Sequence, residues 1–117
     1  MKIYHQQLAA GRWFELYLIE QLANIGSEVV RAISWRNKKN PEYANNAFER
    51  SLELFDLTLQ DPKNKKRLRE VARAREIWVD YFFGDNQYNS TAEFWNKYFY
   101  SFAYAAKMRK NKSSKLS

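Results

Sequence analysis

Apolar residues recur at steps of three and four along most of the chain, and only a few short segments interrupt this period. That spacing indicates amphipathic α-helices, because residues three or four apart lie on one face of a helix. The first such face consists of Trp13, Leu16, Ile19, Leu22, Ala23, Gly26, Val29, Val30 and Ile33. We expect a helix over residues 8–38, with Gly26 on its inner face, where the missing side chain lets a second helix approach closely.

The first two interruptions carry helix-capping signals. Asn40-Pro41-Glu42 supplies an N-cap residue, a first-turn proline and a first-turn carboxylate, so a second helix is expected to begin there. Asp61-Pro62 repeats the cap and the proline, and we expect it to open a third helix. The inner faces predicted for these two helices are Ala44, Ala47, Phe48, Leu52, Phe55 and Leu59, and then Leu68, Val71, Ala72, Trp78, Val79 and Phe82.

A third interruption separates the last two helices. Gly84 is placed to end the third helix as a left-handed cap residue, and residues 84–89 are expected to form a loop. The segment Ser90-Thr91-Ala92-Glu93 has the spacing of a capping box, which predicts the start of a fourth helix. We expect that helix to end at about Lys110 and to be followed by a polar, frayed tail over residues 111–117.

Four helices with short connections favour an all-α fold. An up-down-up-down four-helix bundle is the simplest arrangement that buries one face of each helix. The chain has 117 residues, which suits one domain, and we assign residues 1–110 to it. Aromatic residues make up 17% of the chain, far more than a disordered chain carries.

The residues that most enzymes need are scarce. The chain has no cysteine and a single histidine, His5, so it lacks a thiolate nucleophile, a histidine-based triad and a multi-histidine metal site. Its three glycines are isolated and form no phosphate-binding loop. We therefore expect a non-enzymatic protein with no metal and no cofactor. The sequence shows neither a secretory signal nor a membrane-spanning stretch, so we expect a soluble, cytoplasmic protein that does not enter a membrane.

The charge is strongly positive, with 20 Lys and Arg residues against 13 Asp and Glu residues. In an up-down-up-down bundle, the connection before the third helix and the end of the fourth helix lie at the same pole. That pole then carries Lys63, Lys65, Lys66, Arg67, Arg69, Lys107, Arg109 and Lys110. Such a surface binds the phosphates of RNA or DNA without base specificity, and the alternative interpretation is an ordinary solvated surface.

Aromatic residues surround the predicted fourth helix instead of following one stripe. A helix that is apolar on most sides needs burial on more than one side, which one small bundle does not provide. We expect Trp95, Tyr100 and Tyr104 to form an interface with a second copy of the chain or with a protein partner. The alternative is that the tyrosines lie along the surface with hydrated hydroxyl groups.

Arg75 lies on or beside the apolar face of the predicted third helix. A buried guanidinium needs a carboxylate partner, and Glu28, Asp56, Glu76 and Asp80 are the candidates. We expect a polar network of Glu28, Asp56, Arg75 and Asp80. It is interpreted either as a structural salt bridge or as a pocket for a small ligand.

Three stretches carry a resemblance to known proteins: ANIGSEV at 23–29, DLTLQDPKN at 56–64 and DYFFGDN at 80–86. With these stretches the chain resembles a group of small bacterial all-helical proteins that are described only as uncharacterised. The resemblance covers most of residues 13–107. It implies a bacterial cytoplasmic protein and implies no activity.

In size, basicity and number of helices, the chain is also similar to ribosomal-RNA intervening-sequence proteins. Those proteins are four-helix bundles that form small rings, and a related accessory bundle binds nucleic acid. HEPN-type ribonucleases are small helical bundles as well, but they carry an Arg followed by a His on one helix. Here no histidine follows His5, which argues against a ribonuclease.

The leading functional hypothesis is a non-enzymatic, self-associating bundle whose basic pole binds nucleic acid or a nucleoprotein. A second hypothesis is a scaffold protein that binds a protein partner through the aromatic surface of the fourth helix. A third is a small ligand-binding or hydrolytic bundle centred on Arg75.

Overall fold

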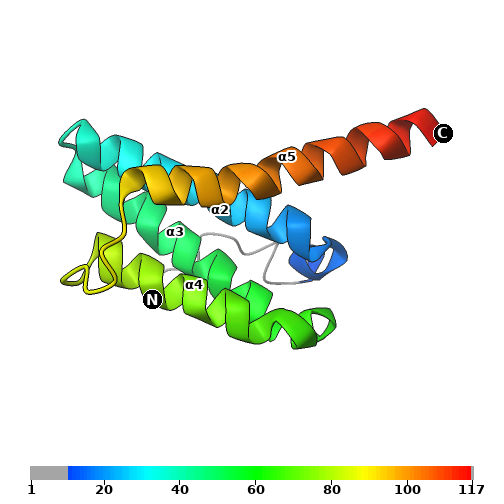
Figure 1. The fold of residues 1–117 in the computed structure, drawn as a ribbon, viewed down its shortest axis with the longest axis horizontal. Coiled ribbons are helices and arrows are strands. Elements are labelled where there is room, and N and C mark those ends of the chain that lie inside the picture. Colours follow the sequence, from blue (N-terminus) through cyan, green and yellow to red (C-terminus); the bar gives the residue numbers. More distant parts are fainter. Residues whose placement is uncertain (1–10, 117) are drawn as a thin grey trace.

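The computed structural model describes the backbone of residues 11–116 and the side chains of residues 11–111. Within this part of the chain, every regular element is helical (Figure 1). In chain order the elements are η1 (Arg12–Glu15), α2 (Leu18–Asn37), α3 (Pro41–Gln60), η2 (Pro62–Arg67), α4 (Leu68–Phe82) and α5 (Ala92–Leu116), where η denotes a 3₁₀ helix. The prediction of an all-α fold is confirmed, and the packing of the helices is compatible with a bundle.

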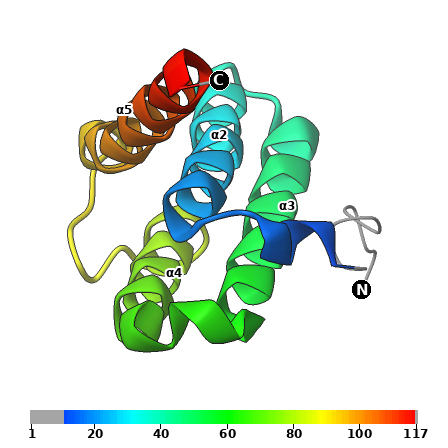
Figure 2. The same cartoon turned by 90° about the vertical axis from the view of Figure 1, so that its right-hand side faces the viewer.

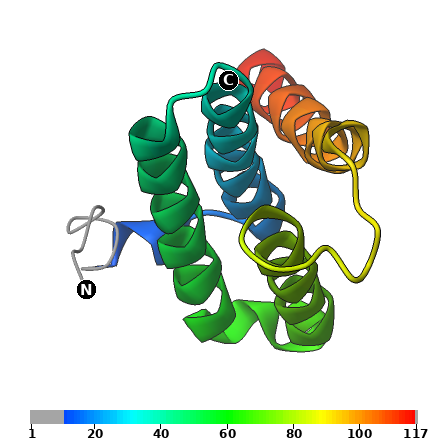
Figure 3. The ribbon, with the colours of Figure 1, turned by 90° about the vertical axis from the view of Figure 1, so that its left-hand side faces the viewer.

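Helix α2 lies at the centre of the fold. It packs along α3 on one side and along α5 on the other, while α4 packs beside α3 (Figures 2 and 3). Helix α5 crosses α2, and its C-terminal half extends beyond the other helices, toward the right of Figure 1. The molecule is therefore elongated, with extents of 45 × 29 × 26 Å.

Gly26 marks the place where α5 crosses α2. A Cβ atom at this position would lie 2.6 Å from the Cβ atom of Phe99, which is closer than two carbon atoms can approach without displacement. The prediction that Gly26 lets a second helix approach closely is confirmed, and the helix that approaches is α5.

Three tryptophans form the centre of the core, together with the phenylalanines that pack around them. Trp13, Trp78 and Trp95 are each at most 1% exposed. The indole N–H of Trp13 donates to the hydroxyl of Thr58 (3.0 Å), and that of Trp78 donates to the hydroxyl of Ser51 (2.9 Å). Each of these two large side chains is therefore buried with its one polar atom satisfied.

The start of α2, the end of α3 and η2 meet at a buried polar junction formed by Gln21, Asp61 and Asn64. The Gln21 amide donates to the Asp61 carboxylate (2.9 Å), and the Asn64 amide donates to the side-chain oxygen of Gln21 (2.8 Å). Burial by itself raises the pKa of Asp61, but hydrogen bonds from Lys63 and Gln21 outweigh that effect and hold this pKa below its ordinary value. Asp61 therefore stays ionised inside the junction.

The first helix differs from the sequence-based expectation at its start. Leu16 has an extended backbone (ψ 146°), which separates η1 from α2 and interrupts the continuous helix that was expected over residues 8–38. The backbone N–H of Tyr17 donates to the Glu20 carboxylate (2.9 Å), and this contact fixes the start of α2. Residues 8–10 of the expected helix lie outside the described residues.

The capping signals at the next two helices are confirmed. The side chain of Asn40 accepts a hydrogen bond from the backbone N–H of Tyr43 (3.1 Å), and Asp61 accepts one from the backbone N–H of Lys63 (3.1 Å). The segment that follows Asp61 is, however, the 3₁₀ helix η2, and the α-helix begins only at Leu68. Ala72 was expected on the inner face of this helix but is exposed, because the buried face is centred on residues 71, 74 and 78.

The prediction that Gly84 is left-handed is wrong. The residues with positive φ in the following loop are Asn86 (52°) and Asn89 (54°), while Gly84 donates its N–H to the carbonyl of Val79 (3.0 Å). A Cβ atom at Gly84 would lie 3.2 Å from the carbonyl oxygen of Asp80, so the glycine avoids a tight contact with the last turn of α4.

The fourth predicted helix, α5, begins one residue later than expected and ends later. The hydroxyl of Thr91, not that of Ser90, accepts the capping hydrogen bond from the backbone N–H of Phe94 (3.0 Å). The helix continues to Leu116, so residues 111–116 extend α5 where a frayed tail was expected. No proline or glycine occurs in this stretch to stop the helix.

Candidate functional site

A cleft of about 520 Å³ lies between α4 and the first half of α5. Four exposed cations surround it, and we call them the basic rim: Lys66, Arg67, Arg69 and Arg73. Three aromatic side chains of α5 line its interior, and we call them the aromatic floor: Phe94, Trp95 and Tyr98. We call the whole site the α4–α5 cleft.

The helical period brings the basic rim together. Lys66, Arg69 and Arg73 are three and four residues apart along η2 and α4, so they project from one side. One carboxylate, Glu70, also lines the cleft, and it pairs with Arg67 at 2.7 Å. Because both members of that pair are exposed, the pair contributes little to the free energy of unfolding. One carboxylate against four cations leaves the rim with an excess of positive charge.

Arg73 was not among the residues predicted to bind nucleic acid. It stands outside the basic run that ends at Arg69, but a spacing of four residues places both on one helix face. Helical spacing is therefore the signal that could have identified Arg73 from the sequence. Its guanidinium lies 5.7 Å from the centre of the Tyr88 ring.

The three side chains of the aromatic floor differ in how much of their surface is exposed to solvent. Phe94 is 46% exposed, Tyr98 is half-buried and Trp95 is 1% exposed. The rings of Phe94 and Tyr98 are nearly parallel, at 18°, with centres 5.9 Å apart. Burial, and then the nearby Glu70, raise the pKa of Tyr98, and Arg67 opposes that rise, so the phenol stays neutral at neutral pH.

Trp95 was expected at an interface, but it belongs to the core. Its ring meets the rings of Trp78 and Tyr98 edge to face, with centres 5.5 and 5.9 Å away. Its buried indole N–H has no hydrogen-bond partner among the described residues, unlike the two other fully buried tryptophans.

The other predicted cations lie outside the cleft. Lys63 pairs with Asp61 and donates to the carbonyl of Phe14 (2.9 Å), so it supports the buried polar junction. The guanidinium of Arg109 lies 3.6 Å from the centre of the Tyr17 ring. The remaining three, Lys65, Lys107 and Lys110, are exposed. Figure 2 looks onto the end of the molecule where η2, the start of α2 and the far end of α5 all face the viewer.

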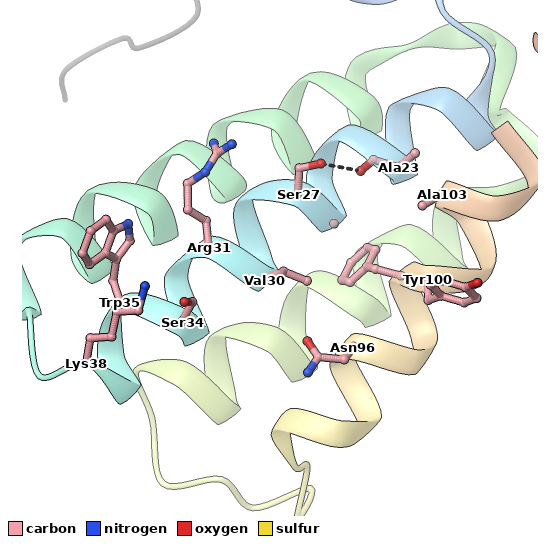
Figure 4. A pocket seen from close by; sticks show the side chains of 12 residues that line it. Ala23, Ser27, Val30, Arg31, Ser34, Trp35, Lys38, Asn96, Tyr100 and Ala103 are labelled. Carbon is pink, nitrogen blue, oxygen red and sulfur yellow. Dashed lines mark hydrogen bonds between the residues drawn. The ribbon is translucent and has the colours of Figure 1, made fainter. Parts of the chain in front are cut away.

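A second depression, of about 800 Å³, lies between α2 and α5 (Figure 4). We call it the α2–α5 groove. Val30 and Trp35 of α2 line it, together with Tyr100 and Ala103 of α5. Tyr100 is 68% exposed and stacks on Tyr104, which is 56% exposed, with ring centres 6.4 Å apart. Both tyrosines that were expected at an interface are therefore exposed on α5.

The four residues of the expected polar network, Glu28, Asp56, Arg75 and Asp80, lie at three separate positions in the fold. Arg75 and Asp56 do pair, at 2.9 Å, but both side chains are partly exposed, so the pair is a surface salt bridge between α3 and α4. Glu28 is instead held by Arg31 (2.8 Å) and Arg50 (3.0 Å).

Asp80, the fourth member of the expected network, organises the loop after α4. Its carboxylate accepts hydrogen bonds from the backbone N–H groups of Gln87 (2.8 Å) and Tyr88 (3.0 Å). The two backbone N–H groups therefore stabilise the Asp80 carboxylate, and no contact with Arg75 is needed.

Within the described part of the chain, no group of three or more His, Cys, Asp or Glu side chains is placed to hold a metal ion. No helix in that part is both long and apolar enough to cross a membrane.

Comparison of the chain with protein-family models, with curated proteins and with solved structures found no match. The chemistry of the α4–α5 cleft is thus the basis for assigning a ligand. Exposed guanidinium and ammonium groups bind anions, and aromatic faces bind flat apolar groups.

Proposed function

We propose that this protein is a non-enzymatic module that binds nucleic acid through the basic rim of the α4–α5 cleft. The observation that supports the proposal is the gathering of four exposed cations, with one carboxylate, around a single cleft. Phosphates are the anions that a nucleic acid presents at regular spacing. Contacts of this kind position the strand and carry no sequence information.

The proposal extends to the cations at the end of the molecule. We propose an up-down-up-down order for the four α-helices, which brings Lys107, Arg109 and Lys110 to the pole of η2. In support, Lys63 and Arg109 contact Phe14 and Tyr17, which are three residues apart in the chain. A strand seated in the cleft would then find further cations along one end of the molecule.

The test is the salt dependence of binding. Fluorescence anisotropy of a labelled oligonucleotide gives the affinity of the native protein across a series of salt concentrations. Each phosphate contact contributes about −0.7 to −0.9 to the slope of log affinity against log salt concentration. Replacing two rim arginines, Arg69→Gln with Arg73→Gln, should reduce the magnitude of the slope by about 1.4 to 1.8.

A matched control removes two exposed cations at the α2–α3 connection, Lys38→Gln with Lys39→Gln. It makes the same change in net charge at residues outside the cleft, and the slope should change far less than with the rim variant. Equal changes in the two variants, or no binding by the native protein at low salt, would contradict the proposal.

A second candidate function is association with another protein through the α2–α5 groove and the exposed apolar residues of α5, with a second copy of the chain as the expected partner. The observation that favours it is the exposure of large apolar side chains on α5, where Tyr100, Tyr104 and Met108 are all more than half exposed. Sedimentation velocity tests it. Tyr100→Ser with Tyr104→Ser should convert an oligomer to a monomer, and a native protein that is already monomeric would contradict self-association.

A further inference from the structure

The aromatic floor of the α4–α5 cleft has no part in a purely phosphate-based contact. Phosphates need only the cations of the basic rim, which are exposed and would act equally well on a flat polar surface. Phe94 and Tyr98 nevertheless line the same cleft as these cations. A ligand that uses both features must combine negative charge with a flat, apolar surface.

The dimensions of the cleft suit such a ligand. Its volume of about 520 Å³ falls within the range of about 300 to 1,000 Å³ that is usual for small-molecule sites. Phe94 is 46% exposed, and its ring is within 18° of parallel to that of Tyr98. Two nearly parallel rings that line a cleft offer a surface on which another flat ring can stack.

We propose that Phe94 and Tyr98 of the aromatic floor stack an unpaired base of single-stranded nucleic acid while Arg69 and Arg73 bind the adjoining phosphates. This inference rests on the proposed function and names the form of nucleic acid that the cleft takes. Stacking on an aromatic side chain tolerates any base, because every base has a flat face. The cleft therefore selects for strandedness and not for sequence.

A duplex uses only part of this site. Its bases are already stacked on one another and paired, and moving one into a protein pocket requires that stacking to be given up. A duplex therefore meets the basic rim through its phosphates and leaves Phe94 uncovered. An acidic protein segment would likewise satisfy the rim without filling the floor.

The experiment compares three labelled probes that carry the same number of phosphates per strand. They are a single strand of about 12 thymidine nucleotides, an abasic strand of the same length, and a duplex of that length. The native protein should bind the thymidine strand about tenfold more tightly than either of the other two. The abasic strand keeps the phosphates and removes the bases, so it isolates the contribution of stacking.

Protein variants locate the effect. Phe94→Ala should reduce affinity for the thymidine strand about tenfold, should leave affinity for the abasic strand unchanged, and should not alter the salt slope. Phe94→Tyr keeps a ring and should retain the preference. Tyr43→Ala is the matched control, because Tyr43 is 50% exposed but lies on α3, away from the cleft.

Two results would overturn the inference, and they differ from each other. Equal affinity of the native protein for thymidine and abasic strands would refute base stacking and leave phosphate binding by the basic rim intact. Absence of binding to all three probes at low salt would refute the proposed function as well. Thermal melting of each variant shows whether it is folded before its affinity is compared.

Discussion

Asp61 is almost completely buried, yet it keeps its charge at the junction of α3 and η2. Gln21 donates to it from α2, and Lys63 donates to it from η2, so one carboxylate joins three elements. A carboxylate in this position stabilises the fold only while it is ionised.

The pH dependence of stability follows from the lowered pKa of Asp61. An aspartate carboxyl group has a pKa of about 3.9 in the unfolded state. When its pKa is lower in the folded state, the group stabilises the fold fully at pH values above the unfolded-state pKa. This stabilisation is lost as the pH falls through the folded-state pKa. Asp61→Asn should reduce the free energy of unfolding by about 1 to 3 kcal/mol at pH 7. Urea unfolding should show that this difference narrows as the pH is lowered below about 4. A difference that stays constant with pH would contradict this assignment, and Asp85→Asn, at an exposed loop residue, serves as the control.

Ser51 should contribute more to stability than its size suggests. Its hydroxyl accepts the indole N–H of Trp78 in the core, so Ser51→Ala leaves a buried donor unpaired, at a cost of about 1 to 3 kcal/mol. The Ser51 hydroxyl itself donates to the carbonyl of Phe48, three residues earlier. Ser101→Ala is the control, because the Ser101 hydroxyl likewise donates to the carbonyl of Tyr98, three residues earlier, but Ser101 is exposed. Equal losses of unfolding free energy in the two variants, measured by urea denaturation, would contradict the role of the buried hydrogen bond.

Local sequence signals predicted single residues well where the interaction is local. Asn40 caps α3 as expected, and Asp61 caps η2, the 3₁₀ helix that precedes α4, because an N-cap hydrogen bond spans only two or three residues. Gly84 was interpreted wrongly, because asparagines at 86 and 89 adopt the left-handed backbone in its place. The burial of the Glu28 carboxylate between Arg31 and Arg50 depends on packing between α2 and α3, which residue spacing alone does not specify.

At the scale of the elements, the attachment of α5 to α2 is the feature that most determines the site. Helix α5 packs mainly on α2 and has few contacts with α4, so the cleft between α4 and α5 remains open. The close crossing at Gly26 and Phe99 holds this arrangement.

Gly26→Ala should therefore weaken the packing of α5. The added Cβ atom would lie 2.6 Å from the Cβ atom of Phe99, so the helices must separate, at a cost of about 1 to 3 kcal/mol. Thermal unfolding should show the loss, while Ser27→Ala, at an exposed neighbouring position, should leave stability nearly unchanged. A Gly26→Ala protein as stable as the native one would show that α5 does not pack there.

Periodicity predicted the four helices and most of the residues that they bury, such as Leu22, Phe55 and Trp78. Ala72 is an exception, because it lies beside the buried face of α4 and is exposed. The 3₁₀ segments η1 and η2 were not predicted. Aromatic residues distributed around α5 gave no preferred side, so the sequence did not reveal that Trp95 is buried while Tyr100 is exposed.

At the scale of the whole molecule, α5 is longer than the helices that support it. Its first half is anchored by Trp95 and Phe99, which are at most 2% exposed, whereas residues 107–111 are exposed. The sequence predicted neither this length nor this projection, because helix propensity sets no end to a polar stretch that lacks proline and glycine.

Hydrogen exchange should divide α5 into two parts. Amides of residues 107–111 should exchange on the order of a hundredfold faster than those of residues 95–102, because the distal turns unfold without breaking the core. Mass spectrometry of deuterated peptides measures both segments in one sample. Equal protection would show that the distal turns are covered in solution, as a second copy of the chain would cover them.

Helix α5 is also the common wall of both depressions. Asn96, Tyr100 and Ala103 face the α2–α5 groove from one side of the helix, while Phe94 and Tyr98 line the α4–α5 cleft from the other. The close contact between Gly26 and Phe99 holds this shared helix against α2. An occupant of the groove and an occupant of the cleft would therefore contact opposite sides of the same helix.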